Sequence, residues 1–428
     1  MGGRLLRRNT DITLQYYSIP HSPFPSIMTN LQTSGKWFFS LSLVVVILLC
    51  YLTTACTQSP ANSQASIEQR TFLNLSLDFL EEYQFPKMQF RDTQVGGLSA
   101  VTYDQQRDLF YAISDDRSRL APARFYTLKL KLNSGDTGEI ALEKVEVANV
   151  TLLKDENGAT YAEGSIDPEG IALSPKGTLY ISSEGVPSQG ITPFIKEFEL
   201  TTGQEQQSLP IPQRYLPNKS SDTEQERGIQ DNLGFESLTV EPISLAAGVG
   251  DPFRLFTATE SALFQDSLPD ESQESTRIRL LHYLIQDIAP TLVVSEHLYL
   301  LEPAPLGTIS NGLTDLVSLD LGGHFLSLER SYGTFGVITK IYQLALGGAT
   351  DTSTIVSLQG NISSITPVKK KLLLDLSTLG IYLDNLEGMT LGPRLPDGTQ
   401  SLLLVSDDNF SDAQMTQFLL FRINVKEK

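Results

Sequence analysis

The chain has 428 residues and a formal net charge of −18 at pH 7. Residues 1–55 hold four basic residues and one acidic residue, so the rest of the chain carries −21. A body this acidic repels nucleic acids and concentrates cations, so we expect no nucleic-acid partner. The only cysteines are Cys50 and Cys56, which excludes a thiolate zinc site and a cysteine nucleophile beyond residue 56.

An apolar stretch near the N-terminus, residues 37–55, has a length between that of a signal-peptide core and that of a spanning helix. Small residues and then Cys56 follow, in an arrangement that resembles a bacterial lipobox with Thr53 where leucine is usual. We expect residues 1–56 to be a lipoprotein signal with lipid on Cys56, a cleaved secretory signal or an uncleaved anchor, with translation starting at Met28. All three alternatives place the body in the periplasm or cell envelope, and the first and third attach it to a membrane.

Residues 57–68 are rich in Ser, Gln and Ala, which is typical of a flexible tether, and we expect residues 69–428 to form one domain. This domain repeats one pattern: a glycine, a short alternating strand, a turn, a second apolar strand and a third strand. The five copies start at Gly96, Asp167, Asn232, Asn311 and Asn385.

The repeats predict an all-β fold, a monomeric β-propeller with five units. The fifth copy lacks an outer strand, and residues 70–86 form an apolar strand without a partner of its own. Pairing the two closes the ring and leaves no open sheet edge. A sixth unit would fit only if the weakly matching stretch 350–378 formed one.

Acidic residues recur at two places in the repeat. On the first strand they are Glu169, Glu236, Asp315 and Glu387, and at the end of the second strand they are Asp115, Asp116, Glu184, Glu260, Glu329, Asp407 and Asp408. The first strand of a propeller blade lines the central channel, so these carboxylates should converge. Buried carboxylates that converge need cations, hydrogen bonds or raised pKa values, and Ca²⁺ is the simplest partner. Alternatively, such carboxylates accept hydrogen bonds from the neighbouring blade and only hold the blades together.

Several paired motifs together resemble the phytase-like family, described as having esterase-like activity of phytase. They are GGLSAVTYD with YAISDD, DPEGIAL with LYISSEG, GFESLTV with LFTATE, NGLTDLVSLD with FLSLERSY, and DNLEGMTLGP with LLLVSDDN. The resemblance covers roughly residues 85–425, and many family members are exported bacterial or cyanobacterial proteins. It implies a propeller that hydrolyses phosphomonoesters with Ca²⁺.

The resulting functional hypothesis is a metal-dependent phosphoesterase with a small phosphorylated substrate. Metal ligands would come from Asp115, Asp116, Glu169, Glu184, Glu236, Glu260, Asp315, Glu387 and Asp407. Arg330 and Arg117 would hold phosphate oxygens, because guanidinium groups match phosphate geometry, and Glu329 or Asp408 would act as base. The acidic body has few cations for a highly phosphorylated substrate such as phytate. The competing hypothesis is a non-catalytic Ca²⁺-binding propeller that binds a ligand or a protein.

Overall fold

The computed structural model describes residues 70–134, 140–218, 225–241, 250–269, 274–320, 322–334 and 336–425. The segments expected to act as leader and tether, 1–56 and 57–68, lie outside these residues. Ala65–Lys428 forms one compact unit. Over the described ranges, no helix is long and apolar enough to cross a membrane.

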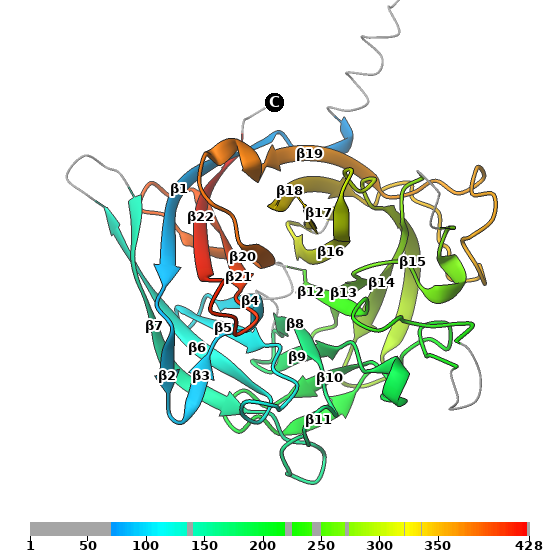
Figure 1. Ribbon diagram of the computed structural model, residues 1–428. Helices are drawn as coiled ribbons and strands as arrows, with labels where there is room; N and C mark the ends of the chain where they lie inside the picture. Colours follow the sequence, from blue (N-terminus) through cyan, green and yellow to red (C-terminus); the bar gives the residue numbers. More distant parts are fainter. Residues whose placement is uncertain are drawn as a thin grey trace, which may run out of the picture. The chain divides into compact units, whose positions relative to one another are not determined.

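Five four-stranded antiparallel sheets make up the described part of the unit (Figure 1). From the innermost strand outward, the first blade is β4 (Leu98–Asp104), β5 (Leu109–Ser114), β6 (Arg124–Ser134) and β7 (Ile140–Leu152). The second is β8 (Pro168–Leu173), β9 (Leu179–Ser183), β10 (Phe194–Phe198) and β11 (Glu205–Ser208). The third is β12 (Phe235–Val240), β13 (Phe253–Thr259), β14 (Arg277–Ile285) and β15 (Leu292–Leu300).

The fourth blade is β16 (Thr308–Ser318), β17 (His324–Gly333), β18 (Gly336–Ala345) and β19 (Lys369–Asp375). The fifth is β20 (Asn385–Arg394), β21 (Gln400–Asp407), β22 (Thr416–Val425) and β1 (Leu75–Phe85). A short hairpin of β2 (Met88–Phe90) and β3 (Thr93–Val95) follows β1. The predicted all-β propeller with five units is confirmed.

The hydrophobic core consists of apolar layers between neighbouring blades. The side chains of a strand alternate between its two faces, and in a ring of blades each face meets another blade, so both faces carry apolar residues. Between the first two blades, for example, Ile113 and Phe125 pack with Ile171 and Ile181. Comparable clusters occupy the other interfaces, including that between the fifth and first blades.

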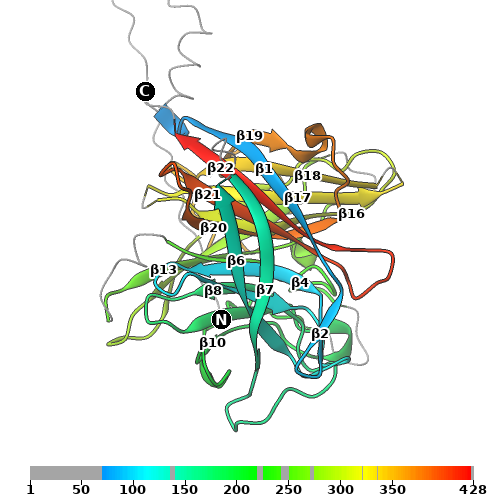
Figure 2. The same ribbon diagram turned by 90° about the vertical axis from the view of Figure 1, so that its left-hand side faces the viewer.

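The N-terminal strand closes the ring, as the sequence predicts. β1 pairs antiparallel with β22, from Leu75 opposite Val425 to Phe85 opposite Thr416. Figure 2 shows β1 running along β22, although the two strands come from opposite ends of the chain. The rings of Phe79 and Phe421 lie 5.5 Å apart across this pair. The outer edge of β22 is therefore covered by the chain itself.

The stretch 350–378 does not form a sixth blade. Its last part, Lys369–Asp375, is β19, the outer strand of the fourth blade. The residues before β19 pack on the third blade, where Arg279 donates to the carbonyl of Ile355 at 3.1 Å and Arg277 donates to that of Gly360 at 2.6 Å. His297 and Asp351 form an isolated bridge. The part before β19 is held by buried arginines of the third blade, and β19 pairs with β18, so the stretch forms no sheet of its own.

Ring closure predicts that β1 is essential for folding. A variant that spans residues 86–428 exposes the edge of β22 and loses apolar contacts of Leu75, Leu77 and Phe79 with the fourth and fifth blades. We expect it to lack a cooperative thermal transition, whereas residues 65–428 should retain one. Circular dichroism during heating measures both, and equal melting temperatures would contradict the role of β1.

Candidate functional site

A β-bulge interrupts each innermost strand at the same height. The pairing with the second strand shifts register at Ser99, at Glu169–Gly170, at Glu236, at Thr314 and at Glu387. A bulge adds one residue to one strand and changes the direction of its side chain. Three of the five bulges carry glutamate, and these glutamates lie close to acids of other blades. In addition to burial, Glu236 raises the pKa of Glu169, and Glu387 raises the pKa values of Glu236 and Asp115.

A second recurring position lies on the neighbouring strand of each blade. Opposite the residue before the bulge stand Ser114, Ser183, Thr259, Glu329 and Ser406. The residue that follows each of these is Asp115, Glu184, Glu260, Arg330 and Asp407. Four blades thus bring an acid to this height, and the fourth blade brings an arginine.

We call the carboxylates that meet here the acid ring. Its members among the described residues are Asp115, Asp167, Glu169, Glu184, Glu236, Glu260, Glu387 and Asp407. Two arginines face them: Arg117 forms an ion pair with Asp167, and Arg330 lies 3.1 Å from Glu260 and 3.4 Å from Glu387. Eight acids and two cations leave a large excess of negative charge if every carboxyl is ionised.

Burial raises the pKa of every carboxyl in the acid ring. For Glu184 the pKa rises to about 8, through burial first and then through Asp167 and Glu260. The pKa values of Glu169 and Glu236 lie well above the ordinary range for the same two reasons. Arg330 partly offsets the effect of burial on Glu387, whose pKa nevertheless lies above its ordinary value. The ring must therefore bind protons or cations near neutral pH.

Three members of the ring, all on the second blade, have the geometry of a cation site. Asp167, Glu169 and Glu184 each offer one carboxylate oxygen, these oxygens lie within 4.8 Å of one another, and all three residues are buried. An all-oxygen donor set suits hard divalent cations such as Ca²⁺. Nε of Arg117 donates to Oδ1 of Asp167 at 2.6 Å and fixes that carboxylate. The residues present therefore fit a metal ion.

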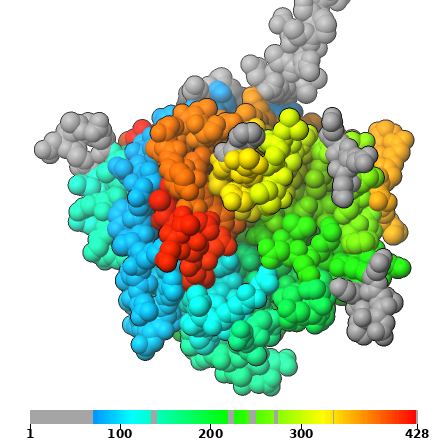
Figure 3. Space-filling model, viewed as in Figure 1, coloured from blue at the N-terminus to red at the C-terminus, as the bar shows by residue number. Residues whose placement is uncertain are grey.

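The end of the channel that carries the acid ring is surrounded by loops, and we call it the rim. Its loops lie beside one another in the space-filling view (Figure 3). The loop after β21, red in the figure, contacts the first blade and the segment before it. Arg124 lies over the ring of Phe410, with 5.8 Å to its centroid, and Lys87 donates to the carbonyl of Ser411. These contacts hold the rim that carries the acid ring.

The sequence model of the family described as "Phytase-like: Esterase-like activity of phytase" matches residues 93–410. The chain belongs to the phytase-like family. No curated protein sequence matches it.

Solved structures similar to this phytase-like chain share little sequence with it. An endo-arabinase from Bacteroides thetaiotaomicron is 11% identical, with 82% of this chain and 99% of that chain covered and a TM-score of 0.41. An α-L-arabinanase from Penicillium chrysogenum is 14% identical, with 60% and 62% covered and a TM-score of 0.28. The fold assignment rests on the strand pairing described above.

Four of the acids predicted as site residues lie outside the acid ring of this phytase-like propeller, Asp315 and Glu329 among them. Asp315 accepts hydrogen bonds from the backbone N–H groups of Met389, at 2.6 Å, and Leu316. Glu329 accepts from Lys370 at 2.6 Å and from Tyr299. Asp315 and Glu329 are each one residue away from the positions that enter the ring. In the fourth blade those positions hold Thr314, at the bulge, and Arg330. Side chains alternate between the two faces of a strand, so a difference of one residue turns a side chain to the opposite face.

Asp116 and Asp408 also have structural partners. Asp116 accepts from Arg124 at 2.7 Å and from the backbone of Ala121 at 2.9 Å. Asp408 accepts from the N–H of Gly97 in the first blade at 2.9 Å and so connects the two ends of the ring. The alternative hypothesis, that recurring acids hold blades together, describes Asp408 and Asp315 well.

The sequence analysis missed Asp167 because the other blades have Gly97, Gly234, Gly312 and Asn385 at its position. The glycines at this position could have aligned the repeats correctly, because Gly234 and Gly312 are required by close packing against an acid of the neighbouring blade. A Cβ on Gly234 would come within 2.7 Å of the Cβ of Glu184. The equivalent Gly312 packs against Glu260. Aligning the repeats on this glycine assigns Thr314, and not Asp315, to the bulge.

The acid ring predicts that stability without metal falls as pH rises. Folded-state pKa values above the unfolded ones mean that stability is fully present below the unfolded pKa, and is lost as pH rises through the folded pKa, about 8 for Glu184. We expect the melting temperature of residues 65–428 in chelator to fall between about pH 5 and about pH 9. Added Ca²⁺ should raise it several degrees at the higher pH and little at the lower one.

Differential scanning fluorimetry across this pH range makes the measurement. Glu184→Gln removes one of the titrating groups and should flatten the pH dependence in chelator. A melting temperature independent of pH, or a Ca²⁺ effect equally large at both ends, would contradict the electrostatic interpretation of the ring.

Proposed function

We propose that this phytase-like protein is a metal-dependent hydrolase of phosphoric esters that acts at the acid ring. Family membership supports the hydrolase class. The observation that carries the metal dependence is the buried triad of Asp167, Glu169 and Glu184, with one oxygen from each within 4.8 Å of the others. These residues would hold a divalent cation, which, when bound, polarises a phosphoryl oxygen and makes a bound water more acidic.

Two arginines would hold the phosphoryl group. Arg330 contacts Glu260 and Glu387, and its side chain remains 13% exposed, so part of the guanidinium is open to a substrate. Arg117 enters the ring from the loop after β5 and binds Asp167 and Asn232. Guanidinium groups at two sides of the ring would orient the ester, because their donors match phosphate oxygens.

A carboxylate of the ring would accept the proton of the attacking water, and we assign this role to Asp115. A raised pKa makes the ionised form of a carboxyl a stronger base. Burial and the neighbouring carboxylates of Glu387 and Asp167 raise the pKa of Asp115 well above the ordinary range. Asp115 replaces the bases proposed from sequence, Glu329 and Asp408, because the structure gives both of those other partners.

The charge of the ring limits the substrate. With only Arg117 and Arg330 opposite eight carboxyls, a substrate with many phosphates would meet strong repulsion. A single phosphoryl group between the arginines and one bound cation fits this balance. We therefore propose a small phosphomonoester as the substrate and not a polyphosphorylated ring.

Hydrolysis of p-nitrophenyl phosphate by residues 65–428 tests this function. Turnover should appear with Ca²⁺ or another divalent cation and disappear with chelator. Glu169→Gln should lower kcat/KM about 100-fold or more, because replacing even an indirect partner of a metal ligand costs about 10–100-fold. The matched control is Glu197→Gln on the same blade, a buried carboxylate that binds Tyr180 and Thr178 away from the ring.

The non-catalytic alternative predicts a different result. A wild-type protein that binds Ca²⁺ in calorimetry, loses that binding in Glu169→Gln and shows no turnover with any divalent cation would be a Ca²⁺-binding propeller. That result would contradict hydrolysis while leaving the metal site intact.

We also propose that the protein acts outside the cytoplasm, as a monomer attached to a membrane through its N-terminal segment. The support is the apolar stretch 37–55 followed by Cys56. In a bacterial host, the full chain should incorporate labelled palmitate and partition with membranes. Cys56→Ser should abolish labelling, and labelling that persists in this variant would contradict lipid attachment at Cys56.

A further inference from the structure

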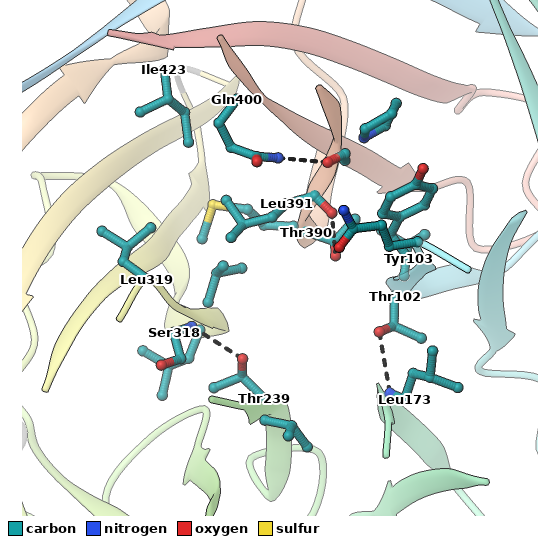
Figure 4. A pocket seen from close by; sticks show the side chains of 18 of the residues that line it. Thr102, Tyr103, Leu173, Thr239, Ser318, Leu319, Thr390, Leu391, Gln400 and Ile423 are labelled. Atoms are coloured by element: carbon teal, nitrogen blue, oxygen red, sulfur yellow. Dashed lines mark hydrogen bonds between the residues drawn. The ribbon is translucent and has the colours of Figure 1, made fainter. Parts of the chain in front are cut away.

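A cavity of about 790 Å³ occupies the end of the channel opposite the acid ring. The innermost strands run from the ring into it: β8 reaches it with Leu173, β12 with Thr239, β16 with Ser318 and β20 with Thr390. Figure 4 shows these side chains around the cavity. Its volume lies within the range of about 300–1,000 Å³ that is usual for small-molecule sites.

The walls of the cavity are mainly apolar. Leu173, Leu319, Leu391 and Ile423 come from four different strands or their ends and line it together (Figure 4). Leu73, which precedes β1, lies at its edge. A ligand with a long apolar part would remove these side chains from water, which is the main source of affinity in such a site.

The charge of the lining is opposite to that of the protein as a whole. The chain carries −18, yet none of the described residues that line the cavity is Asp or Glu. Within the described part of the lining, the charged residue is Arg394, at the end of β20. Its side chain is exposed and donates to the carbonyl of Gly398 at 3.0 Å, so further guanidinium donors remain for an anion.

Hydroxyl groups encircle the inner part of the cavity. Thr102 accepts from the N–H of Leu173 at 3.2 Å, and Thr239 accepts from that of Ser318 at 3.1 Å, so both groups join neighbouring blades. The hydroxyl of Ser318 is different. The residue is 1% exposed, and its Oγ has no hydrogen-bond partner among the described residues. The Ser318 hydroxyl is therefore buried in the wall of the cavity, and the cation of the described lining is Arg394, at its edge.

The acid ring determines which way an anionic ligand would lie. Its carboxylates occupy the far end of the same channel, around Glu236 and Glu387, and repel a negative group. Arg394 and Met389 both line the cavity five residues apart on β20, at most roughly 16 Å at about 3.3 Å per residue. We propose that the cavity binds the single acyl chain of a fatty acid, with its carboxylate at Arg394 and its tail toward Met389.

Calorimetric titration of residues 65–428 with dodecanoate, below its micellar concentration, tests this site. We expect saturable binding of one molecule per chain. Dodecanol, with the same tail and no charge, should bind about fivefold more weakly, as expected for an exposed ion pair. Dodecyltrimethylammonium should bind more weakly still. A cation that binds as tightly as dodecanoate, or no saturable binding of dodecanoate, would overturn the proposal.

Two variants separate the head site from the tail site. Arg394 is exposed, so Arg394→Gln should not change the melting temperature. It should weaken the binding of dodecanoate about fivefold and leave the affinity for dodecanol unchanged. Leu319→Trp fills the cavity and should abolish binding of both. Unchanged dodecanoate affinity in Arg394→Gln would overturn the assignment of the head group even if Leu319→Trp does not fold. Glu169→Gln at the acid ring should bind dodecanoate like the wild type, so this result is independent of hydrolysis.

Discussion

Pairing of β1 with β22 fixes the geometry of the whole propeller, because it turns a row of five sheets into a closed ring. Closure brings the fifth blade against the first, where Asp408 accepts from Gly97 and apolar side chains of β21 and β22 pack against β4 and β6. It also confines the innermost strands to a narrow channel. Every side chain directed into that channel then meets those of the other blades, whatever its charge.

The bulges decide which side chains enter this confined space. At one height the extra residue is Glu169, Glu236 or Glu387, and the neighbouring strands add Asp115, Glu184, Glu260 and Asp407. Burying so many carboxyls costs stability when they are ionised, as their raised pKa values indicate. A structural role needs only one hydrogen-bonded acid per interface, as Asp315 demonstrates. The three clustered acids of the second blade exceed this need, and this excess supports the proposal of a cation site.

The two ends of the channel differ in chemistry although the same five strands line both. Four positions separate Glu236 from Val240, and three separate Glu387 from Thr390. At about 3.3 Å per residue, the acid ring and the cavity are therefore roughly 10–13 Å apart along these strands. One end gathers negative charge with two arginines, and the other gathers apolar groups with Arg394 at its edge. A ligand at either end would contact side chains from several blades.

Much of this architecture follows from the sequence itself. Alternating apolar residues, five repeats and an unpaired strand at residues 70–86 are sufficient to predict the closed propeller, because strand pairing and burial depend on local patterns. The family motifs predict the phytase-like assignment, and the recurring acids predict that carboxylates converge. The tertiary structure alone decided which acids do so. A shift of one residue in the fourth blade turns Asp315 and Glu329 away and brings Arg330 in, and Asp167 joins the ring from a position that is acidic in only one blade. Alternation along a strand makes each side chain's direction depend on register, and register is set by bulges that form only when the strands pair.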